Sequence, residues 1–331
     1  MSLSINKRAQ RNAAAESPGD SKDAAASCAL SIKAAADIIR SGGLVAFPTE
    51  TVYGLGANAL DAAAVQKIFA LKGRPETSPL IVHVSSIEMA REIVTAWPRR
   101  AEELARMWWP GPLSLVLPKD SRVPAIVTAR LSTVGIRMPN HPLALALIEA
   151  AGVPIAAPSA NRFMGLSPTT ADHVKAAFGD ALPILDGGPC EVGIESTVVA
   201  IDGDKLTLLR PGMISLDAIE QFSARPGGAH PSPGMHERHY SPRTPLLLVG
   251  GPAELPDRTG AYVWRVALGP SARSIRMPLD PGPYATQLYR VLHQLDQENW
   301  PWIAVEFPPD APDWTAIRDR LRRAEGGTAG R

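Results

Sequence analysis

The sequence predicts an α/β protein of two domains, the first built on a mixed, twisted sheet with helices on its faces. The chain has 331 residues, which suits two domains of roughly 150 residues each. From residue 30 onward, short apolar runs alternate with helical patterns. Several apolar runs follow one another without a crossover helix, which favours a mixed sheet over a purely parallel one.

The composition is that of a globular protein with an ordinary core, 45% hydrophobic and 20% charged. A formal net charge of +1 gives no overall sign of nucleic-acid affinity, so any basic site must be local. One of the two cysteines, Cys28 and Cys190, lies in a predicted tail, which argues against a disulfide framework. No apolar run reaches the ~18 residues of a membrane span, so we expect a soluble, cytoplasmic protein.

Residues 1–29 are predicted to form a disordered N-terminal tail. They are rich in Ala, Ser and charged residues and contain no aromatic side chain. Organellar presequences avoid acidic residues, and Glu16, Asp20 and Asp23 count against one here.

The first domain is predicted to span residues 30–222. Capping residues such as Asp61 and stop signals such as Gly73 delimit its helices. We expect one helix after Ser85 or Ser86 and others over 31–41, 61–72, 98–108, 141–151 and 215–222. Strands are expected over 44–47, 80–84, 113–118, 134–139, 153–158, 183–188, 195–201 and 205–211.

The composition changes at about Ser223, where Pro, Gly, His and Arg become frequent. Residues 223–244 therefore indicate an interdomain linker. Beyond it, residues 245–325 alternate between strand patterns (246–249, 261–266, 302–307) and helix patterns (283–299, 313–325). This alternation predicts a small second α/β domain.

Polar side chains placed directly after strands carry the chemical signal. The chain contains no GxxxxGK[ST] loop, no GxSxG elbow and no zinc-type Cys/His spacing, and GLGANA at 54–59 lacks the third glycine of a dinucleotide fingerprint. Residues at strand ends converge on one sheet edge, where open α/β folds bind ligands. Four basic residues at such positions predict a site for an anionic small molecule such as a nucleotide: Lys72, Arg74, Arg137 and Arg210.

Eight motifs in register resemble the YrdC-like domain: FPTETVYGLGANA, LKGRP with SPLIVHV, WPGPLSLVL, VGIRMPNHP, VPIAAPSAN, ILDGG, GIESTVV and LLRPG. The linker segment PGMHERHYSP and the helix AIRDRLRRA are similar to the long form of the L-threonylcarbamoyl-AMP synthase family. The resemblance implies a YrdC-like mixed sheet and a small Rossmann-like C-terminal domain.

The family resemblance also implies a reaction. L-threonine, bicarbonate and ATP yield threonylcarbamoyl-AMP and pyrophosphate, and a partner tRNA threonylcarbamoyltransferase complex then modifies an adenosine of tRNA. The substrates supply the nucleophile, so such a protein needs positioning and charge neutralisation more than a reactive side chain. Mg²⁺ is expected with ATP, held mainly by phosphate oxygens and water.

Site residues follow from the motifs that match the family. The resemblance places threonine beside Thr51, His83, Arg137 and Ser196. It assigns the nucleotide to Lys72, Arg74, Ser78, Thr133, Ser159, Asn161, Ser167, Arg210 and Tyr240, with Lys72 and Arg74 as the catalytic pair. Tyr240 is expected to fold over the occupied cleft with the linker as an active-site lid, and position 78 is often Asn in the family.

The stretch after the first strand has its own interpretation. Pro48 ends the strand so that Thr51 can face the cleft, and Glu50 could orient a basic neighbour or help to manage the amine proton. Gly54 and Gly56 are expected to let the backbone approach the ligand closely.

Two other classes of function compete with this enzyme. YrdC-like domains also occur in hydrogenase-maturation carbamoyltransferases, although this chain lacks the acylphosphatase and zinc-finger-like segments of those proteins. A module that binds tRNA or double-stranded RNA weakly is the other alternative, and the near-neutral net charge argues against it as the main task.

Overall fold

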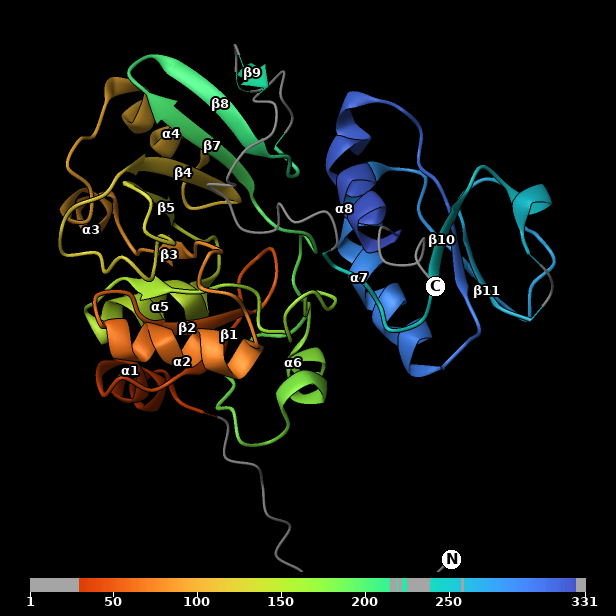
Figure 1. The fold of residues 1–331 in the computed structure, drawn as a ribbon, viewed down its shortest axis with the longest axis horizontal. Helices are drawn as coiled ribbons and strands as arrows, with labels where there is room; N and C mark the ends of the chain where they lie inside the picture. Colours follow the sequence, from red (N-terminus) through yellow and green to blue (C-terminus); the bar gives the residue numbers. More distant parts are fainter. Residues whose placement is uncertain (1–29, 215–218, 220–221, 225–238, 257–258, 326–331) are drawn as a thin grey trace, which may run out of the picture.

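The computed structural model describes residues 30–214, 219, 222–224, 239–256 and 259–325 (Figure 1). The predicted tail 1–29, most of the predicted linker and most of the predicted helix over 215–222 lie outside these residues. Within them, no helix is both long enough and apolar enough to cross a membrane.

The first sheet confirms the predicted mixed architecture. Its strands are ordered β1-β2-β6-β3-β5-β4-β7-β8-β9. The pairs β3–β5, β4–β7 and β8–β9 are parallel and the other neighbours are antiparallel. The strands of this sheet are β1 (Val45–Phe47), β2 (Gly54–Asn58), β3 (Ile81–His83), β4 (Leu113–Pro118), β5 (Thr133–Arg137), β6 (Ile155–Ala156), β7 (Thr197–Asp202), β8 (Lys205–Arg210) and β9 (Phe222–Ala224).

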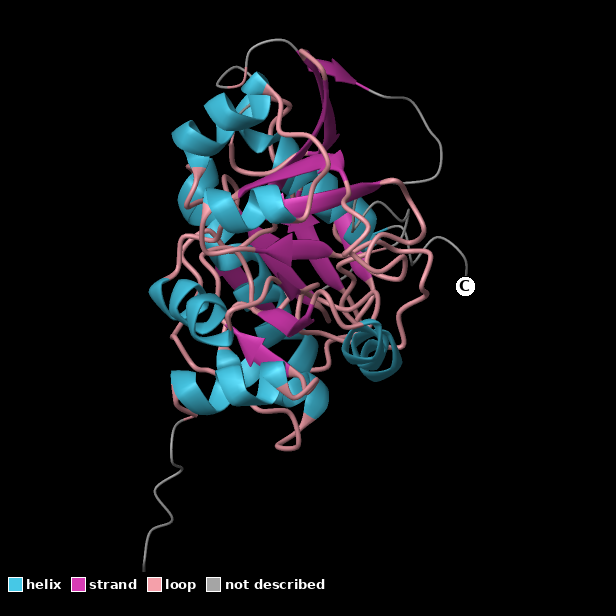
Figure 2. Cartoon of the chain, turned by 90° about the vertical axis from the view of Figure 1, so that its left-hand side faces the viewer, coloured by secondary structure: helices cyan, strands magenta, loops and turns pink. Residues whose placement is uncertain are grey.

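Figure 2 shows the helices of this domain packed around the strands. Most of these helices begin with a side-chain cap. The Asp61 carboxylate accepts hydrogen bonds from the Ala63 and Ala64 amides, and Gly73 ends the same helix in the left-handed conformation (φ 66°). Of the two candidates, Ser86 is the residue that caps α3. The helices are α1 (Ile32–Arg40), α2 (Ala62–Lys72), α3 (Ile87–Glu92), α4 (Arg99–Trp108), α5 (Pro142–Ala151) and α6 (Ala171–Phe178).

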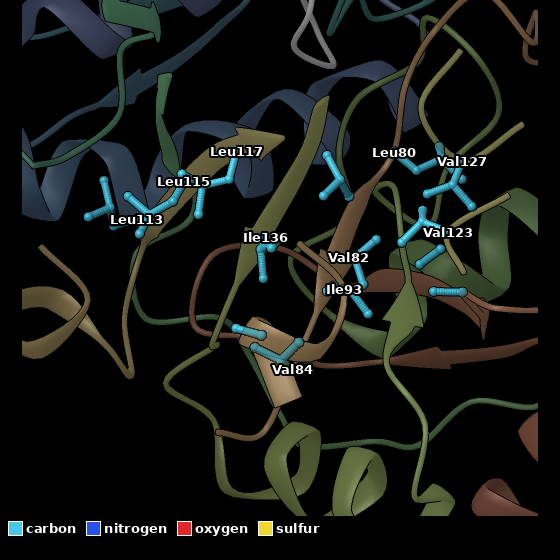
Figure 3. Packing of buried hydrophobic residues seen from close by; sticks show 14 of the residues in the cluster. Leu80, Val82, Val84, Ile93, Leu113, Leu115, Leu117, Val123, Val127 and Ile136 are labelled. Atoms are coloured by element: carbon cyan, nitrogen blue, oxygen red, sulfur yellow. The ribbon is translucent and has the colours of Figure 1, made fainter. Parts of the chain in front are cut away.

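The two faces of the sheet pack against different helices because successive strand residues point in opposite directions. Phe47 and Ile155 join the core cluster of α1 and α5, whereas their neighbours Ala46 and Ala156 join the cluster of α2 and α4. Figure 3 shows the centre of the second cluster, where Leu113, Leu115 and Leu117 of β4 and Ile136 of β5 are packed. Around β1 and β6, helices therefore cover both faces of the sheet.

The second sheet is fully parallel, with strands ordered β10-β13-β11-β12. Its elements are β10 (Leu246–Val249), β11 (Ala261–Trp264), β12 (Arg273–Arg276), β13 (Ile303–Glu306), α7 (Pro281–Gln297), α8 (Thr315–Glu325) and the 3-10 turns η2 (Pro252–Glu254) and η3 (Pro312–Trp314). Figure 1 shows α7 and α8 between this sheet and the first domain. A parallel sheet with helices confirms the predicted Rossmann-like class; the exact domain boundaries stay a prediction.

Some local predictions differ from the structure. The strand expected over 183–188 is wrong: Ile184 makes one isolated bridge to Ala46, and the Asp186 carboxylate then accepts a hydrogen bond from the Gly188 amide (2.9 Å) in a turn. Helix α6 and strands β2, β9 and β12 were not expected. Strand β12 alternates between half-buried and exposed residues, so it lacks the apolar run of a central strand.

Candidate active site

A pocket opens at one edge of the first sheet, where β3 and β5 end at His83 and Arg137 and where β8 ends beside the start of β7. Its empty space, counting the open mouth, is about 560 Å³. Eight of the thirteen predicted site residues line it: Thr51, Arg74, His83, Arg137, Ser159, Ser196, Arg210 and Tyr240.

A hydroxyl-stabilised turn after β1 presents Thr51 to the pocket. The Thr49 hydroxyl donates to the Val52 carbonyl oxygen (2.7 Å) and accepts from the Thr51 and Val52 amides (3.2 Å each). The Thr51 hydroxyl lies 2.8 Å from that of Thr49 and accepts a hydrogen bond from Arg137 Nη1 (2.8 Å). Two buried neighbours therefore fix the position of the Thr51 hydroxyl.

The Arg137 guanidinium is held from three directions. Nε donates to the Gly111 carbonyl oxygen (3.2 Å), Nη1 donates to Thr51, and Nη2 forms an ion pair with a Glu50 carboxylate oxygen (2.7 Å). A charge in an apolar strand needs such a partner. Glu50 does not line the pocket but stands behind Arg137, so it orients a basic neighbour, one of the two roles predicted for it.

His83 is a neutral group in the pocket wall. Its ring packs edge-on against Phe47, with centroids 5.9 Å apart. Burial, together with the nearby charge of Arg137, lowers the pKa of His83 to about 3. The imidazole can therefore donate or accept hydrogen bonds at neutral pH without adding charge.

Ser196 and Arg210 bind each other in the pocket lining. Arg210 Nη2 donates to the Ser196 hydroxyl (3.0 Å) and Nε donates to the Ser196 carbonyl oxygen (3.1 Å). The Ser196 hydroxyl also lies 2.8 Å from the Ser114 hydroxyl of β4. Burial lowers the pKa of Arg210, but a guanidinium keeps its charge at neutral pH.

Arg74, just beyond the end of α2, supplies a further positive charge to the pocket. Its Nη2 donates to the Pro79 carbonyl oxygen (3.1 Å), its Nε donates to the Ser78 carbonyl oxygen (3.4 Å), and its guanidinium lies 5.9 Å from the centre of the Phe163 ring. Burial lowers the pKa of Arg74 to about 10, which still leaves it protonated at neutral pH.

Lys72, two residues earlier, does not line the pocket. Its ammonium donates to the backbone carbonyl oxygens of Ser159 (2.6 Å) and Asn161, and burial lowers its pKa well below the ordinary value. The Asn161 side chain accepts from the Ser159 hydroxyl (2.5 Å) and donates to the Gly165 carbonyl oxygen (2.8 Å). Lys72 and Asn161 thus shape the loop that presents Ser159.

Three more predicted residues lie outside the pocket lining. Ser78 is buried beside Arg74, and the Ser167 hydroxyl donates to Glu195 (2.5 Å). Thr133 begins β5, about 13 Å from Arg137 along the strand at ~3.3 Å per residue. The two-residue period of a strand places Thr133 and Arg137 on the same face of β5.

Tyr240 lines the pocket with a ring that is 1% exposed. Its φ of 61° is a left-handed conformation that bulky residues seldom adopt. Within the described part of the chain, its buried hydroxyl finds no hydrogen-bond partner. Such an atom at a pocket indicates a group that a ligand would satisfy. The predicted lid also involves residues 225–238, which lie outside the described residues.

Glu195 lines the pocket, although the sequence motifs assign it no role. Its carboxylate pairs with Arg320 of α8 (2.9 Å) and accepts a hydrogen bond from the Tyr289 hydroxyl of α7 (3.2 Å). Although burial alone would raise the pKa of Glu195, the charges of Arg320 and Arg210 hold it below its ordinary value. One signal for Arg320 was available, because it shares the buried stripe of α8 with Ala316, Ile317, Leu321 and Ala324.

The role expected for Gly56 is wrong. A Cβ there would lie 2.8 Å from the Phe47 ring and 2.9 Å from the Ile155 side chain, so the absent side chain makes room for core packing and not for a ligand. Gly54 does line the pocket, yet its Cβ direction also meets the Phe47 ring (3.3 Å) and Ala157 (3.2 Å).

Known proteins resemble this chain over both domains. Residues 37–212 match the family described as "Telomere recombination", and residues 214–326 match "Threonylcarbamoyl-AMP synthase, C-terminal domain". The threonylcarbamoyl-AMP synthase of Pyrococcus abyssi is 48% identical over 329 residues, 89% of this chain and 94% of that protein. The threonylcarbamoyl-AMP synthase of Bacillus subtilis is 40% identical over 325 residues, 89% of this chain and 93% of that protein.

A solved structure shares the arrangement as well as the sequence. The crystal structure of P. abyssi Sua5 complexed with L-threonine superposes with a TM-score of 0.83 at 39% identity, covering 89% of this chain and 94% of that one. The motifs, the two sheets and these relatives agree over nearly the whole described chain. The chain therefore belongs to the threonylcarbamoyl-AMP synthase family.

Proposed function

We propose that the pocket binds L-threonine and ATP side by side, and that this enzyme forms threonylcarbamoyl-AMP and pyrophosphate there from bicarbonate. The observation that carries the proposal is the convergence of three buried guanidinium groups, those of Arg74, Arg137 and Arg210, on one pocket. Guanidinium groups suit carboxylates and phosphates, which are the anionic parts of the two substrates. A P. abyssi relative complexed with L-threonine supports the same reading.

Threonine is assigned to the side of the pocket that Arg137 occupies. The Arg137 guanidinium would bind the substrate carboxylate, and the hydroxyls of Thr51 and Ser196 and the neutral His83 ring offer hydrogen bonds to the remaining polar groups. The threonine amine adds to CO₂ from bicarbonate and loses a proton, which gives a carbamate. A carbamate oxygen then attacks the α-phosphorus of ATP, and pyrophosphate leaves.

The nucleotide is assigned to the Arg74 and Arg210 side. These two guanidiniums would neutralise charge on the phosphates as pyrophosphate departs, while Ser159 and the Tyr240 hydroxyl supply hydrogen bonds. Lys72, Asn161, Ser78 and Ser167 would act behind the lining, through Ser159, Arg74 and Glu195. Thr133 lies outside the pocket lining, and its contact with the nucleotide stays a prediction.

Mg²⁺ fits this site only as a companion of ATP. Among the described residues, no group of three or more His, Cys, Asp or Glu side chains could hold a metal ion, and the Glu195 carboxylate in the pocket is paired with Arg320. We therefore assign Mg²⁺ to the phosphate oxygens and water. The product would pass to a tRNA threonylcarbamoyltransferase complex, and we assign the enzyme to the cytoplasm with its substrates.

Pyrophosphate release tests the proposal directly. The purified full chain is incubated with L-threonine, bicarbonate, ATP and Mg²⁺, and pyrophosphate and threonylcarbamoyl-AMP are measured while each substrate is omitted in turn. We expect both products only when all three substrates are present. Pyrophosphate release that does not depend on threonine or bicarbonate would contradict the assignment. An R74A variant, matched by K33A on exposed α1, should lose activity while the control keeps it.

A further inference from the structure

One arginine of the C-terminal domain reaches both strand ends that flank the pocket. The Arg320 side chain is 1% exposed, and its Nε pairs with the Glu195 carboxylate (2.9 Å). Nη2 donates to the Glu195 carbonyl oxygen (3.3 Å), and Nη1 donates to the Pro211 carbonyl oxygen (2.8 Å). Asp319 accepts a further hydrogen bond from Nη1 (3.0 Å), so the guanidinium is used on every side.

The positions of these contacts matter because of their neighbours in the chain. Glu195 precedes Ser196, and Pro211 follows Arg210; Ser196 and Arg210 line the pocket and are hydrogen-bonded to each other. Arg320 therefore holds the backbone on both sides of that contact. Its guanidinium carbon also lies 5.5 Å from the centre of the Tyr240 ring, which lines the same pocket.

Charge gives Arg320 a second effect on the site. Glu195 lies within the electrostatic reach of two arginines, Arg320 and Arg210. Without Arg320, Arg210 is the one of these two cations that remains, and a buried carboxylate left without its partner is strongly destabilised. Pairing with Glu195 would cancel positive charge that Arg210 offers to phosphates.

We propose that Arg320 is a positioning residue for the nucleotide site, so that the C-terminal domain completes the active site of the N-terminal domain within one chain. Arg320 does not touch substrate. It holds Glu195 away from Arg210 and fixes the backbone at 195–196 and 210–211. The inference rests on the proposed function for the identity of the nucleotide, ATP.

The test separates an effect on ATP binding from an effect on threonine binding, and a positioning role of Arg320 from a role in stability alone. Pyrophosphate release by full-length R320A is measured against ATP and threonine concentration, and ATP binding is measured by calorimetry. We expect the KM and the Kd for ATP to rise about tenfold, as for loss of one charge-assisted hydrogen bond. The rise in the threonine KM should be smaller, because among the residues assigned to threonine only Ser196 adjoins a contact of Arg320. The R320K variant keeps the positive charge but loses the forked guanidinium, so its KM and Kd for ATP should lie between those of the wild type and R320A.

A double variant gives a prediction that a merely structural role would not. In E195Q/R320A the carboxylate that competes for Arg210 is gone, so ATP affinity should recover part of the loss seen in R320A. Should R320A fail to fold, the same comparison uses R320K with E195Q/R320K. The matched control is R318A: Arg318 lies on the same helix, but its contacts, to the Pro308 carbonyl oxygen and Asp310, stay within the C-terminal domain.

Two failures are distinguishable. Absence of pyrophosphate release by the wild-type chain would contradict the proposed function. If the wild type is active and a folded R320A has the same ATP Kd and KM, the proposed role of Arg320 is wrong. The role is also wrong if E195Q/R320A binds ATP no more tightly than R320A, or if R318A weakens ATP binding as much as R320A does.

Discussion

Two buried ion pairs flank the pocket, and they face it with opposite charges. In the pair Glu50–Arg137 (2.7 Å), the arginine lines the pocket and the carboxylate stands behind it. In the pair Glu195–Arg320 (2.9 Å), the carboxylate lines the pocket and the arginine stands behind it. The first pair lies within one domain, whereas the second joins the two domains.

The difference shows how one interaction type can serve two purposes. A buried ion pair adds little net stability, because desolvation offsets the attraction, but removing one partner is strongly destabilising. What each pair contributes is therefore the placement of a charge. Glu50 aims a cation at the pocket, and Arg320 restrains an anion that would otherwise compete for Arg210.

The largest effect is expected from R137A. The variant loses the cation assigned to the threonine carboxylate and leaves Glu50 buried without its partner, which should lower the free energy of unfolding by ~3–5 kcal/mol. The threonine KM should rise about 100-fold, equivalent to ~3 kcal/mol, while the ATP KM changes little. Steady-state kinetics and urea unfolding measure the two effects. Equal rises in both KM values would refute the assignment of Arg137.

A pair of neutralising variants gives a smaller and sharper effect. E50Q removes the charge behind Arg137, so the threonine KM should rise by roughly fivefold to tenfold, within the ~1–1.5 kcal/mol of an ordinary hydrogen bond, with no change for ATP. E195Q removes a negative charge that faces the pocket, so the ATP KM should stay level or fall. Steady-state kinetics with ATP and threonine measure both effects. A higher ATP KM for E195Q would contradict the proposed difference between the two ion pairs.

The smallest effect is a dependence of stability on pH on the Arg137 side of the pocket. His83 has an ordinary pKa of 6.5, lowered to about 3 in the folded protein. Because the unfolded chain takes up the proton first, stability is complete above pH 6.5 and is lost as pH falls toward 3. At pH 5.5 the loss from His83 is about 1 kcal/mol. Urea unfolding at pH 7.5 and 5.5 should show H83Q losing less than the wild type; equal losses would contradict a neutral His83.

Much of the fold could be predicted because its signals are local. Asp61 and Gly73 mark the two ends of α2 by capping and left-handed geometry, which need only the residues nearby. The position of the pocket could be predicted from the polar residues after strands for the same reason, since the end of a strand fixes where the next side chain lies. The prediction failed at 183–188, where the hydrogen bond from the Gly188 amide to the Asp186 side chain forms a turn although Ile184 and Leu185 are apolar.

The sequence predicted which residues belong to the candidate site better than it predicted what each of them does there. Lys72 and Arg74 are equally basic and two residues apart, yet the first binds backbone carbonyls of the loop at 159–161 and the second lines the pocket. Their different surroundings come from segments distant in the chain. The contact of Arg320 with Glu195, across 125 residues, is of the same kind.

By itself, the sequence determined most of the helices and strands, the mixed sheet, the basic character of the site and the family, because capping, periodicity and motifs act over short stretches of chain. The tertiary structure alone decided which charge of each buried pair faces the pocket, and that the second domain takes part. Those outcomes depend on the desolvation of charges brought together from distant segments, and no local pattern contains that information.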